Sequence, residues 1–156
     1  MKNKSSGIDL AKSAWLVCHR ACNLIARCEE ALFARAGISP QQFGVLYAIN
    51  EIEEPVTVSK IADFIERDRN TISMIVDRME KAGLVERTRD LNDRRSVRIV
   101  ATKKGKSLFQ HSLNDQIALI SRLAVAFQDG ELEVAIRLLE NMRESALAEL
   151  SRKKQK

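Results

Sequence analysis

Basic side chains that could bind a polyanion are concentrated in the middle of this sequence. Residues 60–106 contain thirteen lysines and arginines against eight aspartates and glutamates, whereas residues 1–59 and 107–156 are each neutral. Arginine supplies eight of the thirteen, and its planar guanidinium can hold a phosphate or a guanine edge through two hydrogen bonds. This segregation predicts a nucleic-acid-binding surface. The simpler alternative is a solvated basic surface without a ligand.

Composition argues against several other classes of protein. The 156 residues, 45% hydrophobic and 30% charged, are typical of one globular domain or a compact lobe with helical extensions. No apolar run approaches the roughly 20 residues that span a membrane, and residues 1–7 lack the apolar segment of a secretory signal. Three cysteines, an odd number, do not form a disulfide framework, so we expect a reduced, cytoplasmic setting. Without a cluster of ligands or an assembled nucleophile and base, we expect no metal, no cofactor and no enzymatic activity.

Hydrophobic periodicity predicts a mainly helical chain with one β-hairpin. Gly37 and Gly83 are expected to end helices in the left-handed conformation, and Gly130 to precede the last helix. Ser39, Thr57 and either Asp68 or Asn70 are candidate N-caps. The expected helices span 8–35, 40–51, 58–65, 70–82, 103–127 and 130–150, and the expected strands span 85–89 and 97–100.

The segment from 57 to 106 has the pattern of a winged helix-turn-helix. Two short amphipathic helices are joined by a tight polar turn at 66–69. The second helix buries a stripe of Ile72, Ile75, Val76 and Met79. The following strands enclose a charged turn at 90–95, which would form a projecting, basic wing.

The long terminal helices predict self-association. The first would be roughly 40 Å long at about 1.5 Å per residue, and its apolar stripe needs a partner. A homodimer formed by the terminal helices is the economical solution, while a monomeric bundle is the alternative. We therefore expect an N-terminal dimerisation helix and supporting helix at 8–52, a DNA-binding lobe at 53–102, C-terminal dimerisation helices at 103–152, and flexible tails at 1–7 and 153–156.

These features together resemble the MarR (multiple antibiotic resistance regulator) family of bacterial transcription factors. The resemblance rests on residues 57–63, 70–73, 76–87, 90–95 and 102–105, and the flanking helices extend it over nearly the whole chain. It implies a homodimer that places two recognition helices in successive major grooves of a pseudo-palindromic operator, with the wings in the flanking minor grooves. It also implies a transcriptional regulator, with repression as the expected effect.

The helix expected at 70–82 exposes side chains suited to base edges and phosphates. Asn can pair with adenine through two hydrogen bonds, Ser can contact several edges, and Met can lie on a thymine methyl group. Many family members have Arg where this chain has Met74, so the operator sequence does not follow from the resemblance. The expected DNA-binding residues of this helix are Arg69, Asn70, Thr71, Ser73, Met74, Asp77, Arg78 and Lys81. Further phosphate contacts are expected from Lys60, Arg67, Lys103 and Lys104.

The wing supplies a second set of candidate DNA contacts. By resemblance, Asp93 holds Arg95 extended while Arg95 enters the minor groove, and Arg94 contacts phosphate. A narrow A·T-rich groove has an enhanced negative potential that favours an inserted guanidinium. An exposed Asp–Arg pair that only stiffens the hairpin is the alternative. The full set of wing residues is Arg87, Arg89, Asp93, Arg94, Arg95 and Arg98.

Two further sets of residues could regulate DNA binding. Cys18 and Cys22 lie four residues apart on one helix face, and some branches of the family sense oxidants with a cysteine of the first helix. Buried thiols with no redox role are the alternative. By resemblance, a small-molecule effector could bind near Trp15, His19, Phe43 and Tyr47, although ordinary core packing also explains these side chains.

The function predicted from the sequence is therefore sequence-specific DNA binding by a homodimeric regulator. An architectural DNA-binding protein of low specificity is the main alternative, and it would show a small affinity ratio between operator and random DNA. A thiol enzyme or protein-interaction module using Cys18 and Cys22 is less favoured, because no C-x-x-C motif is present.

Overall fold

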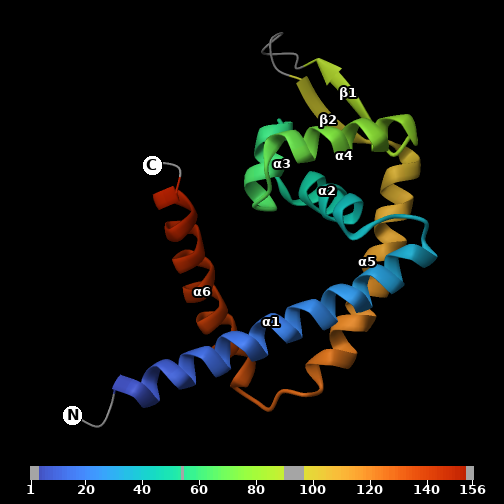
Figure 1. Ribbon diagram of the computed structural model, residues 1–156. Coiled ribbons are helices and arrows are strands. Elements are labelled where there is room, and N and C mark those ends of the chain that lie inside the picture. Colours follow the sequence, from blue (N-terminus) through green and yellow to red (C-terminus); the bar gives the residue numbers. More distant parts are fainter. Residues whose placement is uncertain (1–3, 54, 90–96, 154–156) are drawn as a thin grey trace. The chain divides into compact units, whose positions relative to one another are not determined.

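The computed structural model describes residues 4–53, 55–89 and 97–153, which form helices and one antiparallel hairpin (Figure 1). Two compact units divide the chain, one up to Gln116 and the other from Ile117 onwards. The elements are α1 (Lys4–Arg35), α2 (Pro40–Glu51), α3 (Val58–Phe64), α4 (Arg69–Lys81), β1 (Val85–Arg89), β2 (Val97–Ala101), α5 (Lys103–Ala124) and α6 (Glu131–Lys153).

The predicted order and type of these elements are confirmed, with three differences at helix ends. Helix α1 begins at Lys4 and α6 ends at Lys153, so residues 4–7 and Lys153, expected in flexible tails, are helical. The prediction that the helix beginning at 103 reaches Phe127 is wrong, because α5 ends at Ala124. Beyond it the chain turns, with the Phe127 N–H donating to the Ala124 carbonyl at 3.0 Å. The Gln128 N–H donates to the Glu131 carboxylate at 2.7 Å, which fixes the start of α6.

Side-chain caps define where the helices of the first unit begin. Ser39 and Gln42 form a reciprocal capping box at the start of α2, with bonds of 2.9 and 3.2 Å. Thr57 accepts a 3.3 Å hydrogen bond from the Lys60 N–H and starts α3. Asp68 accepts from two N–H groups of α4, which settles the open choice of N-cap in favour of Asp68.

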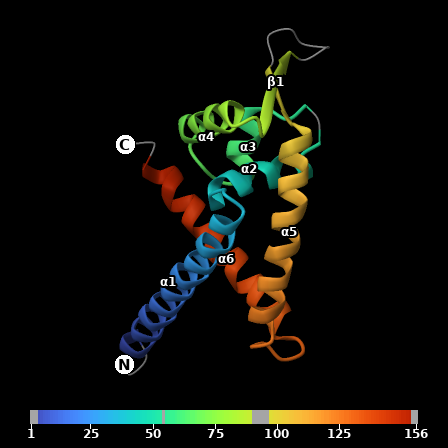
Figure 2. The ribbon, with the colours of Figure 1, turned by 90° about the vertical axis from the view of Figure 1, so that its right-hand side faces the viewer.

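The core of the first unit holds the helix-turn-helix and the hairpin together. Phe43 stacks between Phe33 and Phe109, with ring centroids 4.4 and 5.7 Å apart. In the hairpin, Arg87 pairs with Ile99, and the Ile99 N–H donates to the Val56 carbonyl at 2.9 Å. Figure 2 shows β1 of this hairpin beside α4. The helix-turn-helix contributes a buried stripe that includes Ile61, Ala62, Ile72, Val76 and Met79. This packing fixes which face of α4 remains exposed.

The second unit exposes most of its apolar side chains. From Glu131 to Arg152 only Ala135 is even half-buried, although Ile136 and Leu139 are spaced to lie on one apolar face of this helix. An isolated helix gains little from such a stripe in water, because helices are stabilised mainly by burying it. Among the described residues, no helix combines the length and apolar character of a membrane span.

Candidate nucleic-acid interface

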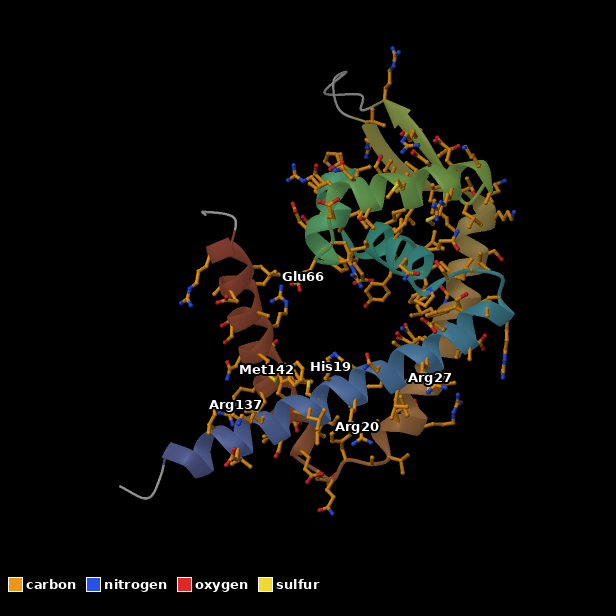
Figure 3. The ribbon with its side chains drawn as sticks, in the orientation of Figure 1. His19, Arg20, Arg27, Glu66, Arg137 and Met142 are labelled. Carbon is orange, nitrogen blue, oxygen red and sulfur yellow. The ribbon has the colours of Figure 1, made fainter. Side chains whose placement is uncertain are left out.

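The turn between α3 and α4 sets the direction in which α4 leaves the core. Glu66 adopts φ 55°, the left-handed conformation that reverses the chain, and it lies at the surface of the lobe (Figure 3). Arg67 then donates its N–H to the Ala62 carbonyl at 2.9 Å, which closes the turn. Arg69 begins α4 beside Asp63, with 3.9 Å between guanidinium and carboxylate. The turn predicted at 66–69 is present, but it covers 65–68, because Arg69 already belongs to α4.

The outer face of α4 carries the side chains expected to contact DNA. Asn70 and Thr71 are exposed in the first turn, and Met74, with 54% of its surface exposed, follows one turn later. Ser73 is half-buried beside them. Arg69, Arg78 and Lys81 are exposed as well, so the helix presents cations at both ends and uncharged groups in its middle.

Arg87 connects the first strand of the hairpin to α4. Its guanidinium binds Asp77 at 2.5 Å and also Glu80, and its backbone N–H donates to the same Glu80 carboxylate at 3.1 Å. Burial alone would lower the pKa of Arg87, but the hydrogen bonds that its guanidinium donates to Asp77 and Glu80 outweigh this effect and raise the pKa. Arg87 and Asp77 were both predicted to contact DNA; here their charges neutralise each other.

Replacing Arg87 by Met should destabilise the lobe by about 1–2 kcal/mol, because two carboxylates lose their partner while they remain partly exposed. Arg89→Met is the matched control, since Arg89 is exposed at the end of the same strand and should change stability by less than about 0.5 kcal/mol. Urea unfolding at a fixed protein concentration measures both. Equal stabilities for the two variants would show that the ion pairs of Arg87 with α4 contribute nothing to the free energy of unfolding.

The four residues expected to contact phosphate occupy different settings. Lys60 is exposed and reaches the Glu53 carbonyl at 3.4 Å. Arg67 is exposed beside a pocket of about 430 Å³ between α1, α2 and α4. Lys103 is exposed, and no described group pairs with its amine. Lys104 instead donates to the Ala82 carbonyl at 2.9 Å, at the end of α4.

Only part of the predicted wing can be placed. Arg89 is exposed where β1 ends, and Arg98 is half-buried in β2. Asp93, Arg94 and Arg95, to which the sequence assigned minor-groove binding, lie outside the described residues. Their role stays a prediction.

The two cysteines for which a redox role was one of two interpretations, Cys18 and Cys22, face each other along α1. Burial, the nearby Cys18 and a hydrogen bond with Cys18 raise the pKa of the Cys22 thiol. A raised pKa lowers the thiolate fraction at neutral pH, and the thiolate is the species that oxidants attack. Oxidant sensing stays a prediction. If a Cys18→Ser, Cys22→Ser protein releases DNA under peroxide as wild type does, these thiols are not the sensor.

The four residues expected near an effector form two separate pairs. Trp15 stacks on His19 on α1 at 5.2 Å, and His19 and Arg20 project from different sides of that helix (Figure 3). Phe43 is buried, and Tyr47 packs against it at 6.2 Å with part of its ring exposed. None of the four lines the pocket between α1, α2 and α4.

Two residues that build this interface were not predicted from the sequence. Glu80 was not singled out, although Asp77 and Glu80 share one helix face and a basic residue follows shortly after the helix end. Gly105 was seen only as part of a motif; a Cβ at this position would lie 2.0 Å from the Leu84 carbonyl oxygen. Nothing in the spacing alone could reveal that contact, because it depends on the crossing of α5 and the end of α4.

A tri-helical core, an exposed second helix of the helix-turn-helix and an attached hairpin define a winged helix-turn-helix protein. Residues 38–97 match the model of the MarR family. The chain is 31% identical to the regulator SarZ of Staphylococcus saprophyticus over 98 residues, which is 63% of each protein. Residues 38–97 are therefore similar to the MarR family, and the chain spans just under two thirds of the length of SarZ.

Solved structures share the fold over most of the chain. The M. tuberculosis transcriptional regulator MosR, solved in complex with DNA, superposes with a TM-score of 0.72 at 23% identity, covering 86% of this chain and 96% of MosR. CouR from Rhodococcus jostii RHA1, bound to p-coumaroyl-CoA, gives a TM-score of 0.76 at 24% identity, covering 85% and 93%. At these identities the likeness establishes the fold.

Proposed function

We propose that this protein is a sequence-specific transcriptional regulator that binds duplex DNA through α4 and the hairpin. The observation that carries the proposal is the outer face of α4, where Asn70 and Met74 lie exposed between Arg69 and the basic pair Arg78 and Lys81. Uncharged groups there can contact base edges while the flanking cations contact phosphates. MosR, which shares the fold, was solved in complex with DNA.

The functional unit in this proposal is a homodimer on a pseudo-palindromic operator. Support comes from the large apolar side chains that α1 and α6 expose, which a second copy would bury. Two α4 helices related by a two-fold axis would then meet half-sites about one helical turn apart. Such a dimer would repress by occupying DNA that the transcription machinery needs, and it would act in the cytoplasm, where the chromosome lies.

Selection of bound duplexes from a random pool, followed by titration against salt, tests the proposal. We expect a two-fold symmetric consensus bound at least 10³-fold more tightly than random DNA. A steep salt dependence with a small affinity ratio would instead identify an architectural DNA-binding protein. A purified chain that binds no duplex in dilute buffer would refute DNA binding altogether. Placing the consensus over a promoter in an in-vitro transcription assay then separates repression from activation.

Asn70→Ala should reduce discrimination more than general DNA affinity. The loss of two hydrogen bonds to a base should weaken binding to the selected operator by about 1–3 kcal/mol, roughly 5- to 150-fold. Affinity for random DNA should change little. Fluorescence anisotropy with both duplexes at one salt concentration measures this difference. The matched control is Arg78→Met, which should weaken both complexes alike. An Asn70→Ala protein that weakens both equally would exclude base contact by Asn70.

We also propose that a small-molecule effector modulates DNA binding. The relative CouR was solved with p-coumaroyl-CoA bound, and in this chain the pocket between α1, α2 and α4 reaches Thr71 in the first turn of α4. An occupant of this pocket would contact both the long helix and the DNA-contacting helix. Thermal-shift screening of small organic acids, with and without operator, tests it, and the absence of any ligand that alters operator affinity counts against an effector.

A further inference from the structure

Helix α4 ends in a backbone motif that leaves several carbonyl groups without a hydrogen-bond donor from the helix itself. Gly83, at φ 68°, donates its N–H to the Glu80 carbonyl at 2.9 Å, and the Leu84 N–H donates to the Met79 carbonyl at 2.9 Å. These two bonds are those of a Schellman motif. The carbonyls of Ala82, Gly83 and Leu84 point onward from the helix end and need donors from elsewhere.

The donors come from the start of α5. The Lys104 amine donates to the Ala82 carbonyl at 2.9 Å, the Thr102 hydroxyl donates to the Gly83 carbonyl at 2.7 Å, and the Thr102 N–H donates to the Leu84 carbonyl at 3.1 Å. The same hydroxyl accepts a 3.1 Å hydrogen bond from the Gly105 N–H and so caps α5. Three consecutive carbonyls at the end of one helix are thus bound by the first turn of another.

We propose that Thr102 and Lys104 are positioning residues, which hold the C-terminal end of α4 at the angle that base contact requires. This inference rests on the proposed function. It replaces the phosphate contact predicted for Lys104 by a hydrogen bond that holds the end of α4. An amine donating to a carbonyl of its own protein has one fewer donor for DNA. A lysine at a helix C-terminus also stabilises the negative end of the α4 dipole. Lys103, which has no described partner, keeps the phosphate role.

The neighbouring lysines provide a matched pair for the test, because each variant removes one positive charge from the same turn. Lys104→Met should lower the affinity ratio between operator and random DNA by about three- to tenfold, the equivalent of one hydrogen bond, without changing the salt slope. Lys103→Met should weaken both complexes and reduce the salt slope by about 0.9, as expected for one lost phosphate contact. Thr102→Val should behave as Lys104→Met does, and Thr102→Ser, which keeps the hydroxyl, should restore the wild-type ratio.

A second measurement tests the contacts of Thr102 and Lys104 with the end of α4 in the absence of DNA. Amide hydrogen exchange of Ala82, Gly83 and Leu84 should accelerate in Lys104→Met and Thr102→Val and stay unchanged in Lys103→Met and Thr102→Ser. Unchanged exchange in all four variants would overturn the inference, as would a Lys104→Met protein that loses salt slope at constant affinity ratio. If the wild type selects an operator but the Lys104→Met and Thr102→Val variants keep its affinity ratio between operator and random DNA, the positioning role alone is refuted. A wild type that binds no duplex refutes the proposed function and this role with it.

Discussion

Gly105→Ala should destabilise the DNA-binding lobe by about 2–3 kcal/mol and lower its melting temperature by roughly 5–10 °C. A Cβ at this position would lie 2.0 Å from the Leu84 carbonyl oxygen and 3.0 Å from its carbon, and both atoms belong to the backbone. Leu84 cannot move aside freely, because its carbonyl accepts from the Thr102 N–H and its own N–H binds Met79. The helix start and the strand must therefore separate.

Gly44→Ala is the control for this prediction. Gly44 also lies inside a helix, and nothing stands within 4 Å of a Cβ built there. Alanine there should stabilise the protein by up to about 1 kcal/mol, since glycine is the poorer helix former. Both variants are compared by thermal unfolding at equal protein concentration, because association shifts the midpoint. Two variants of equal stability would show that α5 does not press against the end of α4.

The elements of the first unit could be predicted because their signals are local. The Ser39 cap with Pro40, the Thr57 cap and the left-handed Gly83 each act within one helical turn, so a short window of sequence contains the whole cause. The stripe of Ile72, Val76 and Met79 has the helical period because one face of α4 packs on the core. Local capping and local periodicity therefore determined the order of the elements.

The contacts between elements could not be predicted in this way. Arg87 and Lys104 were both counted as cations for DNA, yet each binds groups of α4 instead. Their partners lie 7 and 22 residues away in sequence, and only the return of the chain past α4 brings them together. The net charge of a segment gives the number of its cations but not how many are already neutralised within the protein. A charge count consequently overstates the cations available to DNA.

Leu139→Glu should convert the proposed homodimer to a monomer and weaken operator binding by at least about 10²-fold. Leu139 is 52% exposed within the apolar stripe of α6, which includes Ile136 and Met142. Burying such a side chain against a second copy contributes about 1.5–3 kcal/mol, whereas a buried unpaired carboxylate costs several kcal/mol. Without the dimer, two half-sites are bound by two independent chains, and the gain from linking them is lost.

Sedimentation analysis at micromolar concentration reports the mass, and anisotropy reports affinity for a whole operator and a single half-site. The Leu139→Glu chain should bind the half-site as wild type does, because α4 and its supporting core belong to the first unit. Glu144→Gln, on the opposite side of α6, also changes the net charge by a single unit and should leave the dimer intact. A Leu139→Glu chain that remains dimeric would remove the apolar face of α6 from the assembly. A wild-type chain that sediments as a monomer would refute the dimer itself; DNA binding would then depend on one α4 per complex, and a two-fold symmetric operator would lose its physical basis.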